Sequence, residues 1–312
     1  MYPAPLISIL IPVFNRERFI GECIHSAIDQ TRRDLEVVVA DNYSTDGTWA
    51  ICESMARRDK RIRLFRNDAN PGPVRNWQRC IDEARGHLGM LLFSDDSLRP
   101  QFLEKAAPFL DDPEVGFTFA AVQHGPEPGR GRILYAWGGR CGKVPSRRFL
   151  RDAMVHNGAL PCSPGATLFR LADLRKHLAM EIPSSSMRGF ADHGAGPDLL
   201  LLLRTAADYP AIAHLTEPLA HFRDHADSIS RAHGELLDSA YAQARIWFGS
   251  TQSDPQWLDR AFGAYWVQRM KAARGWVNPN ELAAKFLVPG MPRPHYPAAF
   301  WYGISRGLGE RD

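Results

Sequence analysis

The sequence predicts an α/β fold, with a mostly parallel sheet flanked by helices and a helical C-terminal extension. Three observations carry this prediction. Strand-like and helix-like segments alternate between residues 6 and 110 with short connections, as in repeated β-α units. Several of the strand-like segments, such as LISILIPVF and LEVVVAD, contain runs of apolar residues, which is typical of strands that are covered on both faces. From about residue 236 onward, the sequence is helix-like and rich in aromatic residues.

The alternating segments follow one another in a clear order. The predicted strands are LISILIPVF (6–14), LEVVVAD (35–41), RIRLFRN (61–67), LGMLLFSDD (88–96) and VGFTFAAVQ (115–123). The helices between them are ERFIGECIHSAIDQ (17–30), TWAICESMARRDK (48–60), VRNWQRCIDEARG (74–86) and PQFLEKAAPFL (100–110). The first helix has a wide apolar face suited to covering a sheet. Residues 124–165 are expected to be irregular with short strands, and helix-like stretches dominate from Leu171 onward.

The composition is that of an ordinary globular protein. The chain has 312 residues, of which 45% are hydrophobic, and a formal net charge of only +3. So small and scattered a charge argues against nucleic acid as a partner. The five cysteines are widely spaced without a C-x-x-C pair, so we expect reduced thiols rather than disulfides or a zinc site. The sequence also predicts no signal peptide and no membrane span, which favours a cytoplasmic protein.

Polar residues follow three of the predicted strands at the point where each strand ends. These residues are Phe14–Asn15, Asp41–Asn42 and Ser94–Asp95–Asp96. Because ligands in open α/β sheets bind beyond the carboxyl ends of the strands, we expect these residues to meet at one crevice. A carboxylate pair at such an edge can hold a divalent cation beside phosphate oxygens. The alternatives are an Asx turn at Asp41 and a polar helix-capping turn at Asp95–Asp96.

The sequence lacks the two common phosphate-binding motifs. There is no G-x-G-x-x-G after the first strand and no G-x-x-x-x-G-K-[ST], which disfavours a dehydrogenase-type fold and a P-loop ATPase. A nucleotide would instead be bound by Asp41, by the backbone from Pro12 to Asn15 and through a cation. Arg75 and Asn76 lie in the first turn of a predicted helix, where a basic residue suits an anionic ligand. A solvated Arg75 is the alternative.

Four segments, in this order and spacing, resemble the nucleotide-sugar domain of glycosyltransferase family 2, which has the GT-A fold. They are PVFNRERFIGECIHSAIDQT, VVVADNYSTDGT, NPGPVRNWQRCIDEARG and LFSDDSLRP. The resemblance implies a nucleotide-sugar-binding half over residues 1–123, an acceptor-side half over 124–235 and a helical extension over 236–312. It also implies that Asp41 accepts a hydrogen bond from N3–H of uracil or a related base. The expected partners are a nucleoside-diphosphate sugar, with UDP as the expected nucleotide, and a glycan or lipid-linked acceptor.

The resemblance continues later in the chain. SPGATLFR (163–170) looks like the acceptor-side strand of the family, and GPDLLLLLR with EPLAHFRDHADSIS looks like the segment that carries its catalytic base. By this match Asp198 is the general base of an inverting transfer, Arg223 faces the diphosphate and His225 completes a metal shell with Asp95 and Asp96. His225 could equally be a packed or solvent-facing histidine. Asp192 is a rival base.

The resemblance implies Mn²⁺ or Mg²⁺ as the cofactor, with one departure from the family pattern. Many members carry Asp-X-Asp at this place, whereas Phe93 here occupies the first position and Asp95 is the retained ligand. The pathway implied is synthesis of a bacterial surface polysaccharide such as O-antigen. Two alternatives remain open: a nucleotidyltransferase, although the first strand lacks the glycine-rich loop that grips a triphosphate, and a non-catalytic sugar-nucleotide or glycan-binding module.

The C-terminal extension mixes aromatic and basic residues. QWLDRAFGAYWVQRMKAARGWV (256–277) and HYPAAFWYGISRG (295–307) combine Trp, Tyr and Phe with Arg and Lys. This pattern suits peripheral contact with the inner membrane or a homodimer formed through these helices. The alternative is that the helices pack their aromatic side chains on the chain itself.

Overall fold

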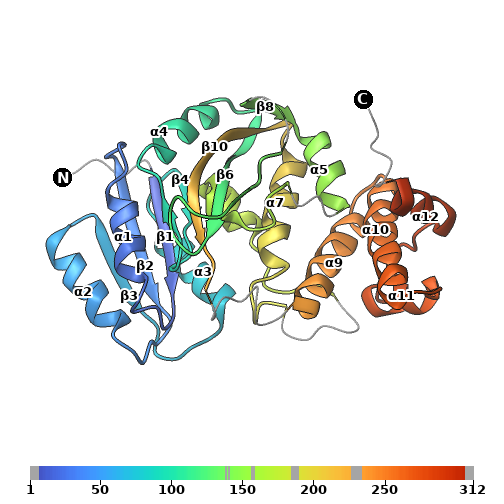
Figure 1. The fold of residues 1–312 in the computed structure, drawn as a ribbon, viewed down its shortest axis with the longest axis horizontal. Helices are drawn as coiled ribbons and strands as arrows, with labels where there is room; N and C mark the ends of the chain where they lie inside the picture. The colour runs from blue at the N-terminus through green and yellow to red at the C-terminus, as the bar shows by residue number, and fades with distance from the viewer. Residues whose placement is uncertain are drawn as a thin grey trace.

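The computed structural model describes residues 7–137, 139, 141–155, 159–183, 190–225 and 234–305, and the side chains of 234–236 are not included. The described part contains a ten-stranded sheet with the strand order β3-β2-β1-β4-β9-β6-β10-β5, while β7 pairs with β6 and β8 with β10. Helices cover the sheet, and a group of C-terminal helices lies at one end of the molecule (Figure 1).

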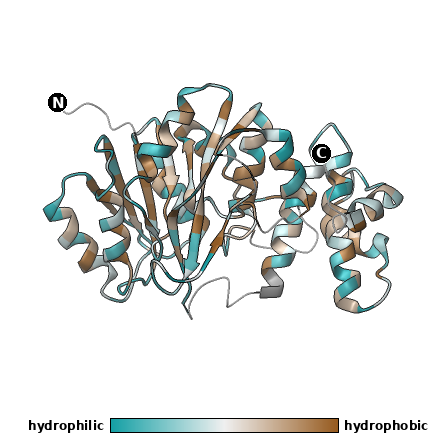
Figure 2. Cartoon of the chain, turned by 45° about the horizontal axis from the view of Figure 1, so that its top comes forward, coloured by the Kyte–Doolittle hydropathy of each residue, from teal (hydrophilic) through white to brown (hydrophobic). Residues whose placement is uncertain are grey.

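The first four long strands form a parallel sheet, as the apolar runs predicted. β1 pairs with β2 and β4, and β2 pairs with β3, all in parallel. Every residue of β1 and β2 is buried, and the central strands are correspondingly hydrophobic (Figure 2). The elements of this half are β1 (Ile7–Val13), α1 (Ile20–Ile28), β2 (Leu35–Asp41), α2 (Thr48–Arg58), β3 (Ile62–Arg66), α3 (Pro73–Glu83) and β4 (Leu88–Leu91).

The second half of the sheet is mixed. β9 runs antiparallel to both β4 and β6, and β10 runs parallel to β6. The elements are β5 (Ser97–Leu98), α4 (Phe102–Ala106), the 3-10 helix η1 (Ala107–Asp111), β6 (Val115–Gly125), β7 (Arg132–Leu134), β8 (Gly142–Pro145), α5 (Ser146–Met154), the 3-10 helix η2 (Pro164–Ala166), β9 (Thr167–Arg170), α6 (Leu171–His177), α7 (Pro197–Asp208) and β10 (Ala211–Arg223).

Two of these elements differ from the expectation of irregular and then helical structure. α5 lies within the region that was expected to be irregular, and the long strand β10 lies where helices were expected. β10 contains Pro218, and its register against β6 shifts on either side of this residue. Because proline donates no backbone hydrogen bond, it is tolerated in a strand mainly at such irregularities. The strand therefore does not show the regular pattern by which strands are predicted.

The C-terminal helices are α9 (Gly234–Ser250), α10 (Gln256–Ala273), α11 (Pro279–Phe286) and α12 (Tyr296–Ser305). α10 and α12 approach each other closely at two glycines. A Cβ atom on Gly263 would lie 1.8 Å from the carbonyl oxygen of Ala299, and one on Gly303 would lie 2.4 Å from the carbonyl oxygen of Gly263. Only glycine fits such a backbone contact. Of the helices described, none is both long and apolar enough to cross a membrane.

Candidate active site

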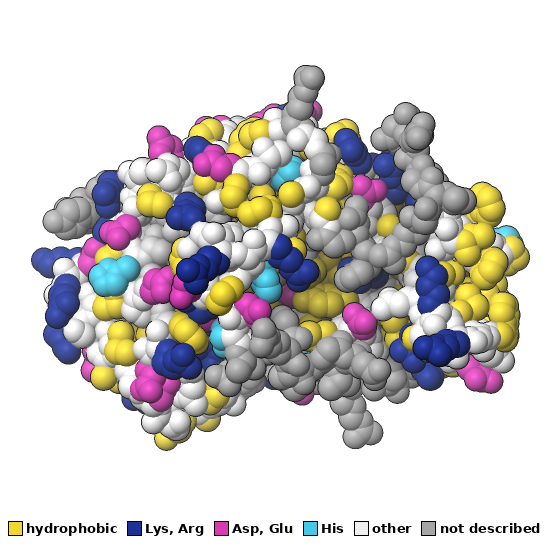
Figure 3. Space-filling view, viewed as in Figure 1, with side chains coloured by type: hydrophobic (Ala, Val, Ile, Leu, Met, Phe, Trp, Pro, Cys, Tyr) yellow, Lys and Arg dark blue, Asp and Glu magenta, His cyan; other side chains and the backbone are white. Residues whose placement is uncertain are grey.

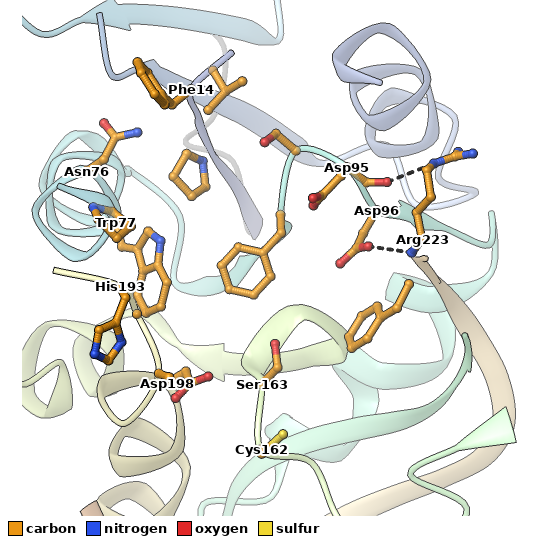
Figure 4. Close-up of a pocket in the computed structure, with 18 of the residues that line it drawn as sticks. Phe14, Asn76, Trp77, Asp95, Asp96, Cys162, Ser163, His193, Asp198 and Arg223 are labelled. Carbon is orange, nitrogen blue, oxygen red and sulfur yellow. Dashed lines mark hydrogen bonds between the residues drawn. The ribbon is translucent and has the colours of Figure 1, made fainter. Parts of the chain in front are cut away.

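A cavity of about 620 Å³ lies beyond the carboxyl ends of β1, β2 and β4. It also takes in residues from β10, from the start of α7 and from α9. Figure 4 shows Asp95, Asp96 and Arg223 on one side of this cavity, with His193 and Asp198 on another and Phe14 and Asn76 on a third. Polar residues from distant parts of the sequence therefore share one space, as the strand ends predicted.

Most of the predicted site residues line this cavity. Those that do are Pro12, Phe14, Asn42, Asn76, Ser94, Asp95, Asp96, Asp198 and Arg223, together with the rival base Asp192. Asn15, Asp41, Arg75 and His225 are not among the lining residues. Arg75 is exposed at the start of α3. Asn15 instead braces the turn after β2, because its side-chain oxygen accepts the backbone N–H of Thr45 at 2.9 Å.

Asp95 carries the carboxylate that faces basic groups. Its Oδ2 lies 3.5 Å from Nε of Arg16 and 2.9 Å from Nε2 of His225. The His225 ring also packs against Phe19, with ring centroids 4.9 Å apart. The structure thus brings Asp95 and His225 together, although His225 is not among the residues that line the cavity. Arg16 was not predicted, although it falls within the PVFNRERF segment.

Asp96 is more deeply buried than Asp95. Its side chain is 8% exposed, and Oδ1 accepts the backbone N–H of Arg223 at 3.0 Å. Burial, followed by the charge of Asp95, raises the pKa of Asp96 well above its usual value. The guanidinium of Arg223 meanwhile pairs with Glu22 at 2.6 Å. The backbone N–H of Arg223 therefore supports the carboxylate of Asp96, while its side chain donates from Nε to the backbone carbonyl of Asp95 at 3.2 Å and reaches Glu22 on α1.

Asp41 lies at the end of β2, as predicted, but it is fully buried behind the cavity wall. Its Oδ2 forms an ion pair with Arg66, whose Nε lies 3.1 Å away, and accepts the backbone N–H of Ser44 at 3.1 Å. Arg66 in turn lies over the rings of Tyr43 and Trp49. The carboxylate thus combines an ion pair with the turn interaction that is the alternative to nucleotide binding.

Asn42 and Asn76 belong to a network of four asparagine side chains beside the cavity. Asn67 donates to the side-chain oxygens of Asn42 at 2.9 Å and of Asn76 at 3.0 Å. Asn42 donates to Asn70 at 2.5 Å, and Asn76 donates to the carbonyl of Ala40 at 2.8 Å. These bonds fix the loop before α3 against the end of β2. Buried amides that are satisfied in this way hold a rigid wall.

Asp198 lies in the first turn of α7 and is only 6% exposed. Its Oδ1 accepts the backbone N–H groups of Gly196 at 2.8 Å and Leu199 at 2.7 Å, and its Oδ2 accepts the hydroxyl of Tyr241 at 2.9 Å. Burial raises the pKa of Asp198 to about 7, although these three hydrogen bonds act in the opposite direction. The effect of burial on the pKa of Asp198 is thus larger than the opposite effect of the hydrogen bonds at the helix N-terminus. A carboxyl with this pKa can accept a proton at neutral pH.

Several cavity residues were missed by the sequence analysis. Trp77, Tyr135, Cys162, Ser163, His193 and Tyr241 all line the cavity. Ser163 opens the SPGATLFR segment and could have been found there. The aromatic residues carry no motif of their own, and Tyr241 lies in a helix whose many aromatic residues give no reason to single it out.

Comparison with known proteins identifies the family. The model of the family "Glycosyl transferase family 2" matches residues 8–178, which is more than half of the chain. An uncharacterized protein of Mycobacterium tuberculosis is 36% identical over 149 residues, which cover 47% of this chain and 44% of that protein. The putative teichuronic acid biosynthesis glycosyltransferase TuaG of Bacillus subtilis is 30% identical over 115 residues, which cover 37% of this chain and 46% of that protein.

A further relative, the GalNAc(5)-diNAcBac-PP-undecaprenol beta-1,3-glucosyltransferase of Campylobacter jejuni, is 34% identical over 95 residues, or 30% of this chain and 31% of that protein. The alignments with these three relatives therefore span less than half the length of each.

Solved structures share the fold. S. aureus TarS 1–349 in complex with UDP-GlcNAc has a TM-score of 0.65 at 19% identity and covers 85% of this chain and 72% of its own. The mannosyltransferase PcManGT from Pyrobaculum calidifontis, in complex with GDP-Man and Mn²⁺, has a TM-score of 0.50 at 17% identity. The match covers 98% of this chain and 87% of PcManGT. At this identity the likeness concerns the fold alone. The predicted α/β fold of GT-A type is confirmed, and the chain belongs to glycosyl transferase family 2.

Proposed function

We propose that the chain is an inverting glycosyltransferase that moves a sugar from a nucleoside-diphosphate sugar to a hydroxyl group. One observation carries the proposal: the buried carboxyl of Asp198, with a pKa of about 7, lines the same cavity as the Asp95–Asp96 pair. A base and a site for a charged diphosphate are thus available to one substrate complex. A transfer assay that compares the wild type with Asp198→Asn tests the proposal.

The proposed reaction uses Asp198 as its general base. The carboxylate takes the proton of the acceptor hydroxyl while that oxygen forms a bond to C1 of the sugar. The bond between C1 and the diphosphate oxygen breaks on the opposite face, and the diphosphate leaves with the electron pair. Attack from the face opposite the leaving group inverts the anomeric carbon. A pKa near 7 suits this role, because the base is largely ionised at slightly alkaline pH and still binds a proton well.

The residues around Asp95 fit a divalent cation. The two adjacent carboxylates supply the oxygen ligands that Mg²⁺ and Mn²⁺ prefer, and Nε2 of His225 lies 2.9 Å from Asp95. Among the described residues, no three His, Cys, Asp or Glu side chains are arranged so that they could hold a metal ion by themselves. A Mg²⁺-type site of one or two carboxylates is completed by substrate phosphates. We propose that Asp95, Asp96 and His225 hold a cation that would stabilise charge on the leaving diphosphate.

The donor and acceptor classes follow from the relatives by analogy. UDP-GlcNAc is bound in the TarS structure, and an undecaprenol-linked glycan appears in the name of the Campylobacter relative. For this chain we propose a UDP-linked donor and a glycan or lipid-linked acceptor of the kind used for bacterial surface polysaccharides. Nucleotidyl transfer would need a loop that grips a triphosphate, and the turn after β1 contains no glycine for such a loop.

Asp41→Ala is expected to weaken UDP binding by about 1–3 kcal/mol, the range for losing a hydrogen bond to a charged group. The proposed contact with the base requires the ligand to replace Arg66, whose side chain is 39% exposed and can move toward solvent. Calorimetry of UDP binding measures the effect. Asp46→Ala serves as the control, because the Asp46 carboxylate lies in the same turn but accepts the backbone N–H groups of Glu17 and Thr48. An unchanged UDP affinity for Asp41→Ala would show that Asp41 is a structural residue only.

We further propose that the chain works on the cytoplasmic face of a membrane and rests on it through α10, α11 and α12. Trp276 is 71% and Trp301 is 60% exposed, and Figure 3 shows hydrophobic side chains gathered at this end of the molecule. Trp276 and Phe300 both contact the ring of Trp266. Residues 256–305 contain six basic and two acidic residues, a charge that complements anionic lipid. The free cysteines agree with a reducing compartment.

Replacing Trp276 and Trp301 together by serine is expected to lower binding to phosphatidylglycerol vesicles at least tenfold. Two Trp rings contribute more than the ~1.4 kcal/mol that corresponds to one decade of affinity. Flotation measures the bound fraction, with neutral phosphatidylcholine vesicles as the reference. Ile133→Ser, which changes an exposed apolar residue on β7, is the control. Equal flotation of all variants, or a dimer that dissociates on the double substitution, would contradict the membrane proposal.

A further inference from the structure

The first helix of the C-terminal extension reaches into the cavity. α9 contributes Leu237 and Tyr241 to its lining. Both lie in the segment that was expected to form a separate extension, and Tyr241 follows Asp198 by 43 residues in the sequence. The helix is held against the rest of the chain by Arg245, whose Nε donates to the carbonyl of Ala153 at 2.7 Å. The extension is therefore part of the site wall.

Tyr241 makes a specific contact there. Its hydroxyl donates to Oδ2 of Asp198 at 2.9 Å, whereas Oδ1 is held by two backbone N–H groups at the start of α7. Among the described residues, Tyr241 supplies the side-chain hydrogen bond to this carboxylate. A carboxylate oxygen can accept more than one hydrogen bond, so Oδ2 retains a lone pair for a substrate hydroxyl. The tyrosine thereby decides which way that lone pair is directed.

The other groups around Asp198 come from four segments of the chain. Arg245 on α9 carries a positive charge that favours the ionised carboxylate. Cys162, before η2, and Tyr135, after β7, lie together with the Tyr135 hydroxyl 3.6 Å from the Cys162 sulfur. Burial raises the pKa values of Cys162, Tyr135 and Tyr241, so all three are neutral near pH 7. On the loop before α7, Asp192 and His193 also line the cavity.

We propose that Tyr241 is a positioning residue for the base: its hydroxyl orients Asp198 toward the acceptor hydroxyl and favours the ionised carboxylate. This inference rests on the proposed role of Asp198. The physical reason is that a hydrogen bond donated to a carboxylate stabilises its charged form and not its protonated form. Without this bond, one of the interactions that lower the pKa of Asp198 is lost, so burial raises that pKa further. The carboxyl would then hold its proton to a higher pH, and less of the enzyme would be active at neutral pH.

The test is the pH dependence of turnover for Tyr241→Phe. The acidic limb of the kcat profile is expected to move up by about one to two pH units, the size expected for losing one hydrogen bond to a charged group. At pH well above this limb, kcat is expected to recover to within a few-fold of the wild type. KM for the donor is expected to stay the same, because Tyr241 contacts Asp198, and Asp198 lies across the cavity from the Asp95–Asp96 pair (Figure 4).

Tyr209→Phe is a matched control. Its hydroxyl donates to Oδ2 of Asp173 at 2.9 Å, the same bond at the same length, and it lies at the other end of α7 outside the cavity. The pH profile of Tyr209→Phe is expected to match the wild type. Incorporation of 3-fluorotyrosine at position 241, a stronger donor, is expected to move the acidic limb down. This second variant keeps the ring in place, so it tests the inference even where Tyr241→Phe folds poorly.

The outcomes separate this inference from the proposed function. An acidic limb that is unchanged in both Tyr241 variants, in a protein whose Asp198→Asn form has lost turnover, would overturn the positioning role and leave the base in place. Retained turnover in Asp198→Asn would instead remove the base, and the inference with it. Opposite shifts in the two Tyr241 variants, with no shift in Tyr209→Phe, would support it.

Discussion

Asp198→Asn is expected to lower turnover by ~10²–10⁴, the range typical of losing a general base. The substitution keeps the shape of the side chain and its backbone contacts with Gly196 and Leu199, but an amide cannot take the proton from the acceptor. Donor binding is expected to stay intact, because Asp198 lies on the opposite side of the cavity from Asp95 and Asp96 (Figure 4). Single-turnover kinetics and UDP calorimetry measure the two effects separately.

Asp192→Asn is the control for this substitution. Asp192 also lines the cavity, but it is exposed to solvent, whereas Asp198 is buried and has a pKa raised to about 7. We therefore expect Asp192→Asn to lower turnover much less than Asp198→Asn does. If Asp192→Asn abolishes transfer while Asp198→Asn retains most of it, the base is assigned to the wrong residue. If neither substitution matters, the inverting mechanism is wrong.

Asp95→Ala is expected to weaken cation-dependent UDP binding by more than the ~10–100-fold that is typical of losing a residue that only supports a metal ligand. Asp95 presents its Oδ2 toward Arg16 and His225 with its side chain 20% exposed, so it is the carboxylate more accessible to an ion. Titration of Mn²⁺ in the presence of UDP measures the affinity. The side chain is small and near the surface of the cavity, so the fold should survive.

Asp96→Ala is expected to act less on the cation and more on stability. It removes the acceptor for the backbone N–H of Arg223, and an unsatisfied buried donor costs about 1–3 kcal/mol of folding free energy. Thermal unfolding distinguishes this loss from a loss of binding. Equal losses of Mn²⁺ affinity in both variants would mean that the two carboxylates share the ion. Unchanged affinity in both would remove the cation from the mechanism.

The predictability of the fold differs between its two halves. The apolar runs of β1 and β2 predict strands that are buried on both faces. The helix between the two strands predicts that they run parallel, as they do. β10 was missed because Pro218 and the register shift beside it interrupt any strand pattern. Antiparallel β9 contains only four residues, too few for its direction to be inferred locally.

The predictability of the site follows the same division. Residues at strand ends, such as Asp95 and Asn42, were placed correctly in the cavity because parallel strands end at one edge of the sheet. Contacts between distant segments could not be inferred. Arg66 lies on the neighbouring strand β3 and forms an ion pair with Asp41. Tyr241 contacts Asp198 only because α9 packs against α7. Such pairs depend on tertiary packing, which cannot be inferred from a local pattern in the sequence.

The anomeric configuration of the product tests the central claim most directly. After a panel of nucleoside-diphosphate sugars has been screened with Mn²⁺ for a donor that raises the unfolding temperature, the new linkage can be examined by NMR. We expect a UDP-linked donor to stabilise the protein and the transferred sugar to carry the configuration opposite to that in the donor. A product that retains the donor configuration, or a protein that no nucleotide sugar stabilises, would contradict the account.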